Sequence, residues 1–398
     1  MDGMRISAPL FKVALAVPHG VPFLERLQVG VARHARAAGW TFVRMPGQLD
    51  QFSLDWLKEW RGDGALVAAL SPRNLDLIRR LNIPVVNLVS NSDDDGIPAV
   101  SIDHQAVGRL AARCLRSRGF INLAYYGEKG TYSSQQRKLG FIAALAEDGL
   151  KPEIVEANAY SARALMPHQR RLERWLTSLP PRTGVFAWND VLGVEVLQTC
   201  QRLGLAVPEH LAVLGVDDDP VLCEFSQPQL SSIMRDNEKN GLVAATLLQR
   251  LMEARRRGRP APRDRLHPTI PPLGVTERRS TATYACRHPQ VEELVRRIRN
   301  CLDRTPTIDD LMRGLPLSRR RLECLFRQEL GVSIYQFALR ARLGLARELI
   351  ARNDGHRTLT AIARECGFSS LSHLRQAFRR EAGPSQEHSK TLSGSTPV

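Results

Sequence analysis

Three polar side chains directly follow apolar runs that have the composition of buried strands. Asn189 and Asp190 come after Gly184 to Trp188, and Asp217 comes after Leu211 to Val216. Because ligands of open α/β sheets bind beyond the carboxyl ends of the strands, these positions predict a ligand site. Amide, carboxylate and guanidinium groups each offer two atoms that can bridge neighbouring hydroxyl oxygens, which suits a polyhydroxylated ligand.

Arg137 supplies a guanidinium group for the same site. The acids also have structural alternatives, since Asp190 could cap the helix that begins at Val191 and Asp217 could cap a turn before Pro220. Arg137 and Asp190 are favoured as ligand contacts over Asp217.

Further candidates for this site are a histidine and two aromatic side chains. His19 comes after the first predicted strand and therefore faces the same edge. Trp188 or Phe23 could cover the apolar face of a sugar, although a single aromatic side chain in an α/β domain is more often part of the core.

Two similar stretches near the C-terminus, Ser318 to Phe326 and Ser370 to Phe378, start with a capping serine and place Leu and Phe four residues apart. If those apolar side chains face a core, the opposite face of each helix is available to DNA. The side chains predicted to contact DNA are Arg319, Arg320, Arg321, Glu323 and Cys324 on the first stretch and Ser372, His373, Arg375 and Gln376 on the second.

The roles within this set differ. Arg320, Glu323 and Cys324 are predicted to reach base edges, whereas Arg319 and Arg321 touch phosphate or only solvent. For His373, a surface side chain without a role in binding is the alternative.

Each stretch follows a short helix and a tight turn, which is the arrangement of a helix-turn-helix motif. Thr307 caps the first short helix and Thr358 the second, and Gly367 stands where a chain leaving a helix adopts a positive φ. Tyr335 to Arg352 carries an apolar stripe at helical spacing, so this helix is predicted to hold the two motifs at a fixed separation.

The first 276 residues alternate strand-like and helical runs. Phe11 to Val17 predicts a buried strand and Pro22 to Ala38 a helix that ends at Gly39. Strands that alternate with helices indicate parallel sheets covered on both faces.

The net charge of +15 is unevenly distributed. Residues 1–251 hold 28 Lys and Arg against 26 Asp and Glu, 252–287 hold 9 against 3, and 288–398 hold 19 against 12. The positive excess therefore lies beside the two helix pairs, where it would attract phosphate.

Several other classes of protein are disfavoured. The seven cysteines form no C-x-x-C pair and the ten histidines show no metal-binding spacing, so neither disulfides nor a metal is predicted. No nucleophile, base and third group occur at motif spacing, so no enzyme activity and no cofactor is expected. Without a membrane-spanning run or a secretory signal, the protein is expected in the cytoplasm.

The C-terminal part resembles the AraC/XylS family of transcription regulators, whose signature is met by Gly331, Arg342, Ala346, Ile362-Ala363, Gly367-Phe368, Phe378 and Gly383. The base-reading positions of that family fall on Arg320, Glu323 and Cys324. The first part is similar to the effector domain of LacI/GalR-type repressors at Val100 to Asp103, Arg137 to Phe141, Asn189-Asp190 and Leu214 to Asp217. That resemblance implies a two-lobed α/β domain of the periplasmic-binding-protein type 1 with a sugar-like effector in its cleft.

The xylose-operon regulators, of the XylR type, join these two parts in the same order. The resemblance implies an effector domain at 1–276, a linker at 277–289, an all-α DNA-binding domain with two helix-turn-helix motifs at 290–388 and a disordered tail at 389–398. Near His19 that family tends to have a Tyr and an Arg that this chain lacks, so a sugar-like effector is predicted without being identified as xylose.

The expected function is sequence-specific regulation of carbohydrate-utilisation genes. The expected partners are double-stranded DNA, the effector, a second copy in a homodimer and, for an activator, RNA polymerase, with no membrane. The alternative is a cytoplasmic sugar-binding protein or enzyme of the same fold.

Overall fold

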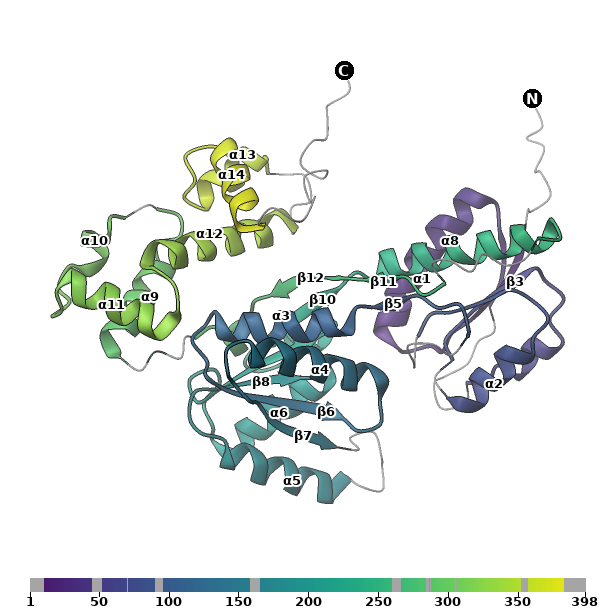
Figure 1. Ribbon diagram of the computed structural model, residues 1–398, viewed down its shortest axis with the longest axis horizontal. Coiled ribbons are helices and arrows are strands. Elements are labelled where there is room, and N and C mark those ends of the chain that lie inside the picture. Colours follow the sequence, from purple (N-terminus) through teal and green to yellow (C-terminus); the bar gives the residue numbers. More distant parts are fainter. Residues whose placement is uncertain are drawn as a thin grey trace. The chain divides into compact units, whose positions relative to one another are not determined.

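The computed structural model describes residues 11–44, 52–69, 71–89, 96–157, 165–259, 266–283, 286, 288–304, 306–351 and 357–382. The chain divides into two compact units, and the first of them ends at Thr283. The first unit contains two α/β lobes, and the described residues of the second unit form helices and connecting turns (Figure 1).

The first lobe is built on a four-stranded parallel sheet with the strand order β2-β1-β3-β4. The central strands β1 and β3 are apolar on both faces and almost wholly buried, as expected for a sheet covered by helices on each side. The strands are β1 (Lys12–Ala16), β2 (Thr41–Arg44), β3 (Gly64–Val67) and β4 (Val85–Asn87). The helices are α1 (Pro22–Ala38), the short 3-10 helix η2 (Asp55–Lys58), α2 (Pro72–Arg80) and α8 (Asn237–Arg256).

Helices α1 and α8 pack at a close crossing that requires glycine on both sides. A Cβ on Gly30 of α1 would lie 1.8 Å from the carbonyl oxygen of Glu238, and a Cβ on Gly241 of α8 would lie 1.9 Å from that of Leu27. Because α8 follows most of the second lobe in the chain, this crossing returns the chain to the first lobe before the last strand of the second lobe completes its sheet.

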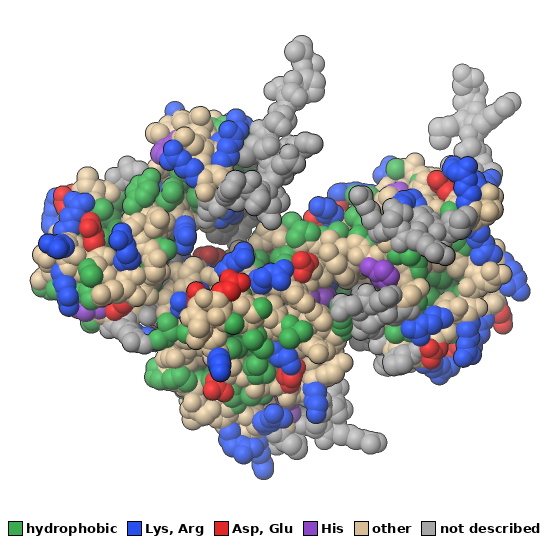
Figure 2. All heavy atoms as spheres, viewed as in Figure 1, with side chains coloured by type: hydrophobic (Ala, Val, Ile, Leu, Met, Phe, Trp, Pro, Cys, Tyr) green, Lys and Arg blue, Asp and Glu red, His purple; other side chains and the backbone are tan. Residues whose placement is uncertain are grey.

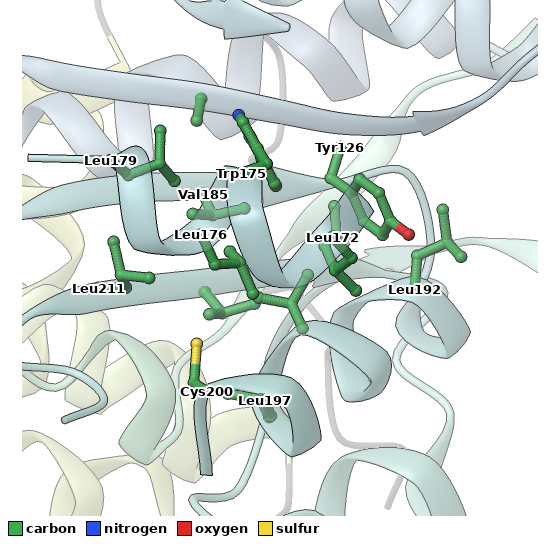
Figure 3. Packing of buried hydrophobic residues seen from close by; sticks show 14 of the residues in the cluster. Tyr126, Leu172, Trp175, Leu176, Leu179, Val185, Leu192, Leu197, Cys200 and Leu211 are labelled. Atoms are coloured by element: carbon green, nitrogen blue, oxygen red, sulfur yellow. The ribbon is translucent and has the colours of Figure 1, made fainter. Parts of the chain in front are cut away.

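The second lobe is built on a six-stranded sheet with the order β12-β10-β9-β8-β6-β7, in which β12 is the antiparallel edge strand. The strands are β6 (Asn122–Glu128), β7 (Glu153–Ala157), β8 (Thr183–Ala187), β9 (Leu211–Val216), β10 (Ser231–Arg235) and β12 (Pro272–Thr276). The helices are α3 (His104–Arg116), α4 (Tyr132–Ala146), α5 (Leu165–Ser178), α6 (Asp190–Leu203) and α7 (Pro220–Phe225). Figure 3 shows side chains of α5, α6 and β8 packed together in the core of this lobe, among them Trp175, Val185 and Leu197.

Three segments of the chain connect the two lobes. The first leads from β4 through β5 (Ser101–Ile102) into α3, the second leads from β10 into α8, and the third returns from α8 through β11 (Thr269–Ile270) to β12. β5 and β11 pair in parallel, with Ser101 opposite Thr269. Such short paired crossings allow two lobes to change their relative angle.

The second unit contains two small helical cores that share one long helix. Its helices are α9 (Pro289–Arg299), α10 (Ile308–Met312), α11 (Arg319–Leu330), α12 (Ile334–Ala351), α13 (Leu359–Glu365) and α14 (Leu371–Ala382). Ile334 and Phe337 of α12 lie in the core with α9 to α11, whereas Leu343 and Ala346 lie in the core with α13 and α14. The prediction that this helix joins the two motifs is confirmed.

Several local predictions are confirmed as well. Helix α1 ends at Gly39, which has φ +66°, and Gly367 has φ +73° after α13. Thr307 caps α10 in a reciprocal capping box with Asp310.

The segment 277–289, which the sequence assigns to a linker, is partly packed into the first unit. Ser280 is fully buried, and its hydroxyl donates a hydrogen bond to Val213 O at 2.6 Å. Thr281 is also fully buried. Gly383 and the tail at 389–398 lie outside the described residues.

Candidate functional site

Asn189 forms the turn from β8 into α6. Its side-chain Oδ1 accepts a hydrogen bond from Leu192 N–H at 2.9 Å, which makes Asn189 the N-cap of α6. The capping role that the sequence leaves open for Asp190 therefore belongs to its neighbour.

Asp190 is buried behind the loop that follows β9. It is 1% exposed, its Oδ1 accepts from the Ser232 hydroxyl at 2.6 Å, and its Oδ2 accepts from Asp219 N–H at 2.8 Å. Burial raises the pKa of Asp190 to about 8, with repulsion from Asp217 as the next cause, and the two hydrogen bonds oppose this rise. With both oxygens occupied, Asp190 holds the loop and is less well placed for a ligand than the sequence predicts.

Asp217 occupies the exposed side of the same loop. Its φ of +112° is rare for a residue with a Cβ, and its side chain is 21% exposed. Its Oδ1 accepts from Arg235 Nη1 at 2.7 Å and lies 3.7 Å from Arg137 Nη2. The turn before Pro220 is capped by Asp219 instead, which accepts from two N–H groups of α7.

Arg137 reaches this point from α4. Its side chain is 2% exposed and donates from Nη1 to Trp188 O, while its Nε is buried without a hydrogen-bond partner among the described residues. Burial lowers the pKa of Arg137 to about 10, Asp217 opposes this shift, and the nearby Arg235 adds to it. Arg137 thus stays charged near neutral pH, in contact with the ends of β8 and β9.

Three residues that the sequence analysis did not select complete the cleft. Arg235 ends β10 and lies over the Phe23 ring, with 4.7 Å between its guanidinium carbon and the ring centroid. Arg26 of α1 in the first lobe donates to Asp218 O at 2.9 Å, so the cleft is bridged from both lobes. The strand-end rule that selected Asn189 did not find Arg235, because the strand before it, Ser231 to Met234, begins with two serines and contains only two apolar residues.

His104, the third of these residues, begins α3. Burial lowers the pKa of His104 well below its usual value, and the charges of Arg137 and Arg235 lower it further. The ring is therefore neutral at physiological pH. Its Nδ1 is buried without a partner in the described part of the chain.

The two remaining ligand candidates of the sequence analysis lie in different settings. His19 follows β1, and its Nδ1 lies 3.0 Å from Arg44 Nη2 at the end of β2. Trp188 donates from Nε1 to Ser133 Oγ at 3.1 Å and packs against the core of the second lobe. For Trp188, these contacts favour the core role that the sequence left as the alternative.

The first helix predicted to face DNA, α11, turns its apolar side inward as predicted. Leu322 and Phe326 are fully buried, and Leu325 is half-buried. The predicted outward side chains are all exposed, namely Arg319, Arg320, Arg321, Glu323 and Cys324.

Ion pairs distinguish the arginines of α11. Arg319 donates to Glu323 Oε1 at 2.9 Å and to Asp309 Oδ1 at 3.3 Å, so its charge is partly neutralised. Arg320 and Arg321 form no ion pair with the described residues.

The second helix predicted to face DNA, α14, buries Leu374 and exposes Ser372, His373 and Gln376. Arg375 is only half-exposed. The His373 ring lies edge-to-face on Phe368 with 5.4 Å between centroids, and its Nδ1 lies 3.1 Å from Ser369 Oγ. In the space-filling view, Lys and Arg side chains are spread over the visible face of this helical unit (Figure 2). DNA contact by these residues remains a prediction.

Two further observations concern the described residues as a whole. In that part of the chain no group of three or more His, Cys, Asp or Glu side chains is arranged to hold a metal ion. None of its helices combines the length and the apolar character needed to cross a membrane.

Comparison with known proteins gives two domain matches and several relatives. Residues 112–281 match a periplasmic binding protein-like domain, and residues 311–386 match a helix-turn-helix domain. The xylose operon regulatory protein of Escherichia coli (strain K12) is 27% identical over 334 residues, which are 82% of this chain and 83% of that protein. Its namesake from Haemophilus influenzae is 25% identical over 378 residues, 93% of this chain and 96% of that protein.

A solved structure supports the fold over nearly the whole chain. The structure of a xylose-binding transcription activator, xylR, covers 94% of this chain and 96% of its own, with a TM-score of 0.61 and 24% identity. The order of the two matched domains, together with the length of these alignments, shows that the chain is a DNA-binding transcription regulator in which a periplasmic binding protein-like domain precedes a helix-turn-helix domain, and that it is similar over most of its length to the xylose operon regulatory proteins.

Proposed function

We propose that this regulator binds a small sugar-like effector between the two lobes of its first unit, and that Arg137, Asp217 and Arg235 hold it. The observation that carries this assignment is the meeting of two buried guanidinium groups on Asp217 Oδ1, at the carboxyl ends of the strands. Charged, bidentate groups of this kind bind adjacent hydroxyls well. Asn189, after β8 in the second lobe, and His19, after β1 in the first lobe, remain candidates, and Asp190 supports the site from behind.

Effector binding is proposed to change the angle between the lobes. Arg26 already links α1 of the first lobe to the Asp217–Asp218 backbone of the second, so a ligand at Asp217 would act directly on the contact between the lobes. An effector can shift this equilibrium only by binding one lobe angle better than the other.

The second unit is proposed to bind double-stranded DNA with α11 and α14 as its two reading helices. Arg320, Glu323 and Cys324 would contact base edges from α11, with Arg319 and Arg321 at phosphates. From α14 the contacts would come from Ser372, His373, Arg375 and Gln376.

A homodimer is proposed from the exposed apolar side chains beside the loop after β9. Phe225 is 84% exposed and Val221 is 63% exposed on α7, and Val191 is 45% exposed at the start of α6. Large exposed apolar side chains grouped in this way mark protein interfaces. We assign this surface to a second copy of the chain, in the cytoplasm, and RNA polymerase becomes a further partner if the protein activates transcription. The role of the first unit is binding rather than catalysis.

The effector site is tested by calorimetric titration of the full chain with a panel of monosaccharides and their acids. Arg137→Gln should weaken binding of the effector about tenfold or more, because a hydrogen bond to a charged group contributes roughly 1.5 to 3 kcal/mol. Arg202→Gln is the matched control, because Arg202 lies on α6 and its side chain is half-exposed. Equal affinities for wild type and Arg137→Gln would rule out this site.

A further inference from the structure

We propose that the effector is an anionic sugar derivative, a monosaccharide that carries a carboxylate or a phosphate, because the cleft holds more guanidinium groups than carboxylates that could neutralise them. This inference rests on the proposed function, since it specifies the effector of the same cleft. It concerns charge, which separates sugar acids and sugar phosphates from the neutral sugars.

Two guanidinium groups in the cleft share a single carboxylate. The side chains of Arg137 and Arg235 are 2% and 9% exposed, and both face Asp217 Oδ1, at 3.7 Å and 2.7 Å. Among the described residues, Asp217 is the only carboxylate that pairs with either of them. Arg26 adds a third positive charge, and its hydrogen bonds go to the uncharged carbonyls of Asp217 and Asp218.

The other acids nearby are already engaged elsewhere. Both oxygens of Asp190 accept hydrogen bonds from the protein. Asp218 pairs through Oδ1 with Arg278 at 2.8 Å and accepts from Thr276 through Oδ2 at 2.9 Å. Among the described residues, neither carboxylate forms an ion pair with Arg137 or Arg235, and Asp190 acts on Arg137 only as a minor, longer-range charge.

Unused donors accompany this charge excess. The Nε atoms of Arg137 and Arg235 are both buried without a hydrogen-bond partner among the described residues. Buried donors without a partner are unfavourable, and a buried charge without a counter-charge is more so. A hydroxyl could accept such a bond, but only an anionic group accepts the bond and also supplies the missing negative charge.

The electrostatic environment around the cleft is positive as well. The pKa of His104 is held well below its usual value by burial and by the charges of Arg137 and Arg235. In the first lobe, Arg44 lies beside His19 at the carboxyl ends of β1 and β2. An anion would therefore enter a positive field from both lobes.

The test is calorimetric titration of the full chain with matched ligands: xylose, xylonate and a xylose phosphate, and glucose, gluconate, glucuronate and a glucose phosphate. At least one acid or phosphate should bind about tenfold more tightly than its neutral parent, and the gap should shrink at high salt. If the sugar acids bind most tightly, the site accepts a carboxylate; if the sugar phosphates do, it accepts a phosphate. Because this comparison uses the wild-type protein, it does not depend on any variant folding.

Arg235→Gln provides a second test, because it removes one of the two buried positive charges. This variant should lose about tenfold or more in affinity for the anionic ligand and less for a neutral sugar, so the preference for the anion should narrow, whereas Arg202→Gln should match wild type. If a neutral sugar binds as tightly as or more tightly than its acid and phosphate, the inference is overturned and the proposed function stands. If no monosaccharide of either class binds, both are overturned.

Discussion

Asp217 is the carboxylate on which the two buried arginines of the cleft converge, and its conformation depends on a second acid. Asp190 accepts from the N–H of Asp219 and so holds the loop that carries Asp217. The hydroxyl of Ser232 binds the other oxygen of Asp190 and also accepts from Asp218 N–H at 3.0 Å. One acid is thus positioned by another that is buried behind it.

The buried carboxyl of Asp190 should make stability depend on pH. Because its pKa in the folded protein is raised to about 8, the folded state keeps a proton that the unfolded chain releases. This contribution to stability is present at low pH and is lost as pH rises from about 4 to about 8. Asp190→Asn cannot ionise, yet it retains a donor for Ser232 Oγ and an acceptor for Asp219 N–H.

The free energy of unfolding of Asp190→Asn should therefore increase relative to wild type as pH rises through this range. The slope should be at most about 1.4 kcal/mol per pH unit. Urea unfolding at several pH values measures it. A difference that stays constant across the range would contradict the raised pKa.

Arg320 and Arg321 offer a matched pair on α11. Arg320→Ala should weaken binding to the specific site by about 1 to 3 kcal/mol and affect random DNA much less, as for a lost bidentate contact to a base. Arg321→Ala should weaken both DNAs alike, because a phosphate contact carries no sequence information. Fluorescence anisotropy with the two DNAs makes the comparison, and equal losses for Arg320→Ala would identify it as a phosphate contact.

At this scale the sequence predicted which residues follow the strands, but it favoured Asp190 over Asp217 as a ligand contact without showing that Asp190 is buried and Asp217 partly exposed. Asp190 and Asp217 both follow a buried strand, and nothing local separates them. The two acids differ in their partners, because Ser232 binds Asp190 and Arg235 binds Asp217. Both partners belong to β10, which lies far along the chain from Asp190. Such tertiary partners cannot be read from one sequence. Whether Asp190 or Asp217 contacts the effector stays a prediction.

At the scale of elements, glycine residues allow the main helices to cross at short distance. Gly30 and Gly241 let α1 and α8 approach so closely that only the hydrogen side chain of glycine fits between the two helices. The pair Gly108 and Gly140 plays the same part between α3 and α4, where a Cβ on either would lie 2.1 Å from a backbone oxygen of the partner helix. Each lobe thus has one close helix pair that fixes its shape.

Gly241→Ala should therefore destabilise the first unit. The added methyl group would overlap the backbone at Leu27, and overpacking of this kind costs roughly 1 to 3 kcal/mol or more. Gly344→Ala on α12 is the control, because nothing lies within 4 Å of its Cβ position and alanine favours a helix by up to about 1 kcal/mol. Thermal unfolding should show a lower Tm for the first variant only, and an unchanged Tm would contradict the close crossing.

The order of the elements could be predicted from the sequence, because the apolar runs and the caps are local signals. Helix α1 and the turn at Gly367 follow from such signals. No local pattern indicates that α8 returns to the first lobe or that β12 joins the second sheet in antiparallel fashion. These features depend on contacts between distant segments, and the packing of Ser280 and Thr281 into the first unit belongs with them.

At the scale of the whole molecule, the chain joins an effector unit to a DNA-binding unit, and a second copy of the chain is the proposed partner. The surface around Phe225 is the part proposed to join two copies of the chain. It lies on α7, directly after the loop that carries Asp217, so an effector at Asp217 would act close to the proposed interface.

Phe225→Asp should dissociate the homodimer, because it places a charge in an apolar interface. Sedimentation velocity should then show a monomer, while effector affinity measured by calorimetry stays close to that of wild type. Leu203→Asp on α6 is a control on another exposed apolar side chain, which is 38% exposed. A wild-type protein that is already monomeric at micromolar concentration would contradict the homodimer.

The central claim is that effector binding in the first unit controls DNA binding by the second. The most direct measurement is the affinity of the full chain for DNA selected from a random pool, determined with and without the effector found by calorimetry. The effector should change the affinity of wild type at least about fivefold, which is typical of coupling between two sites. Arg137→Gln should bind the same DNA with the ligand-free affinity of wild type and show no response to the effector. An effector that binds the wild-type protein yet leaves its DNA affinity unchanged would contradict the account.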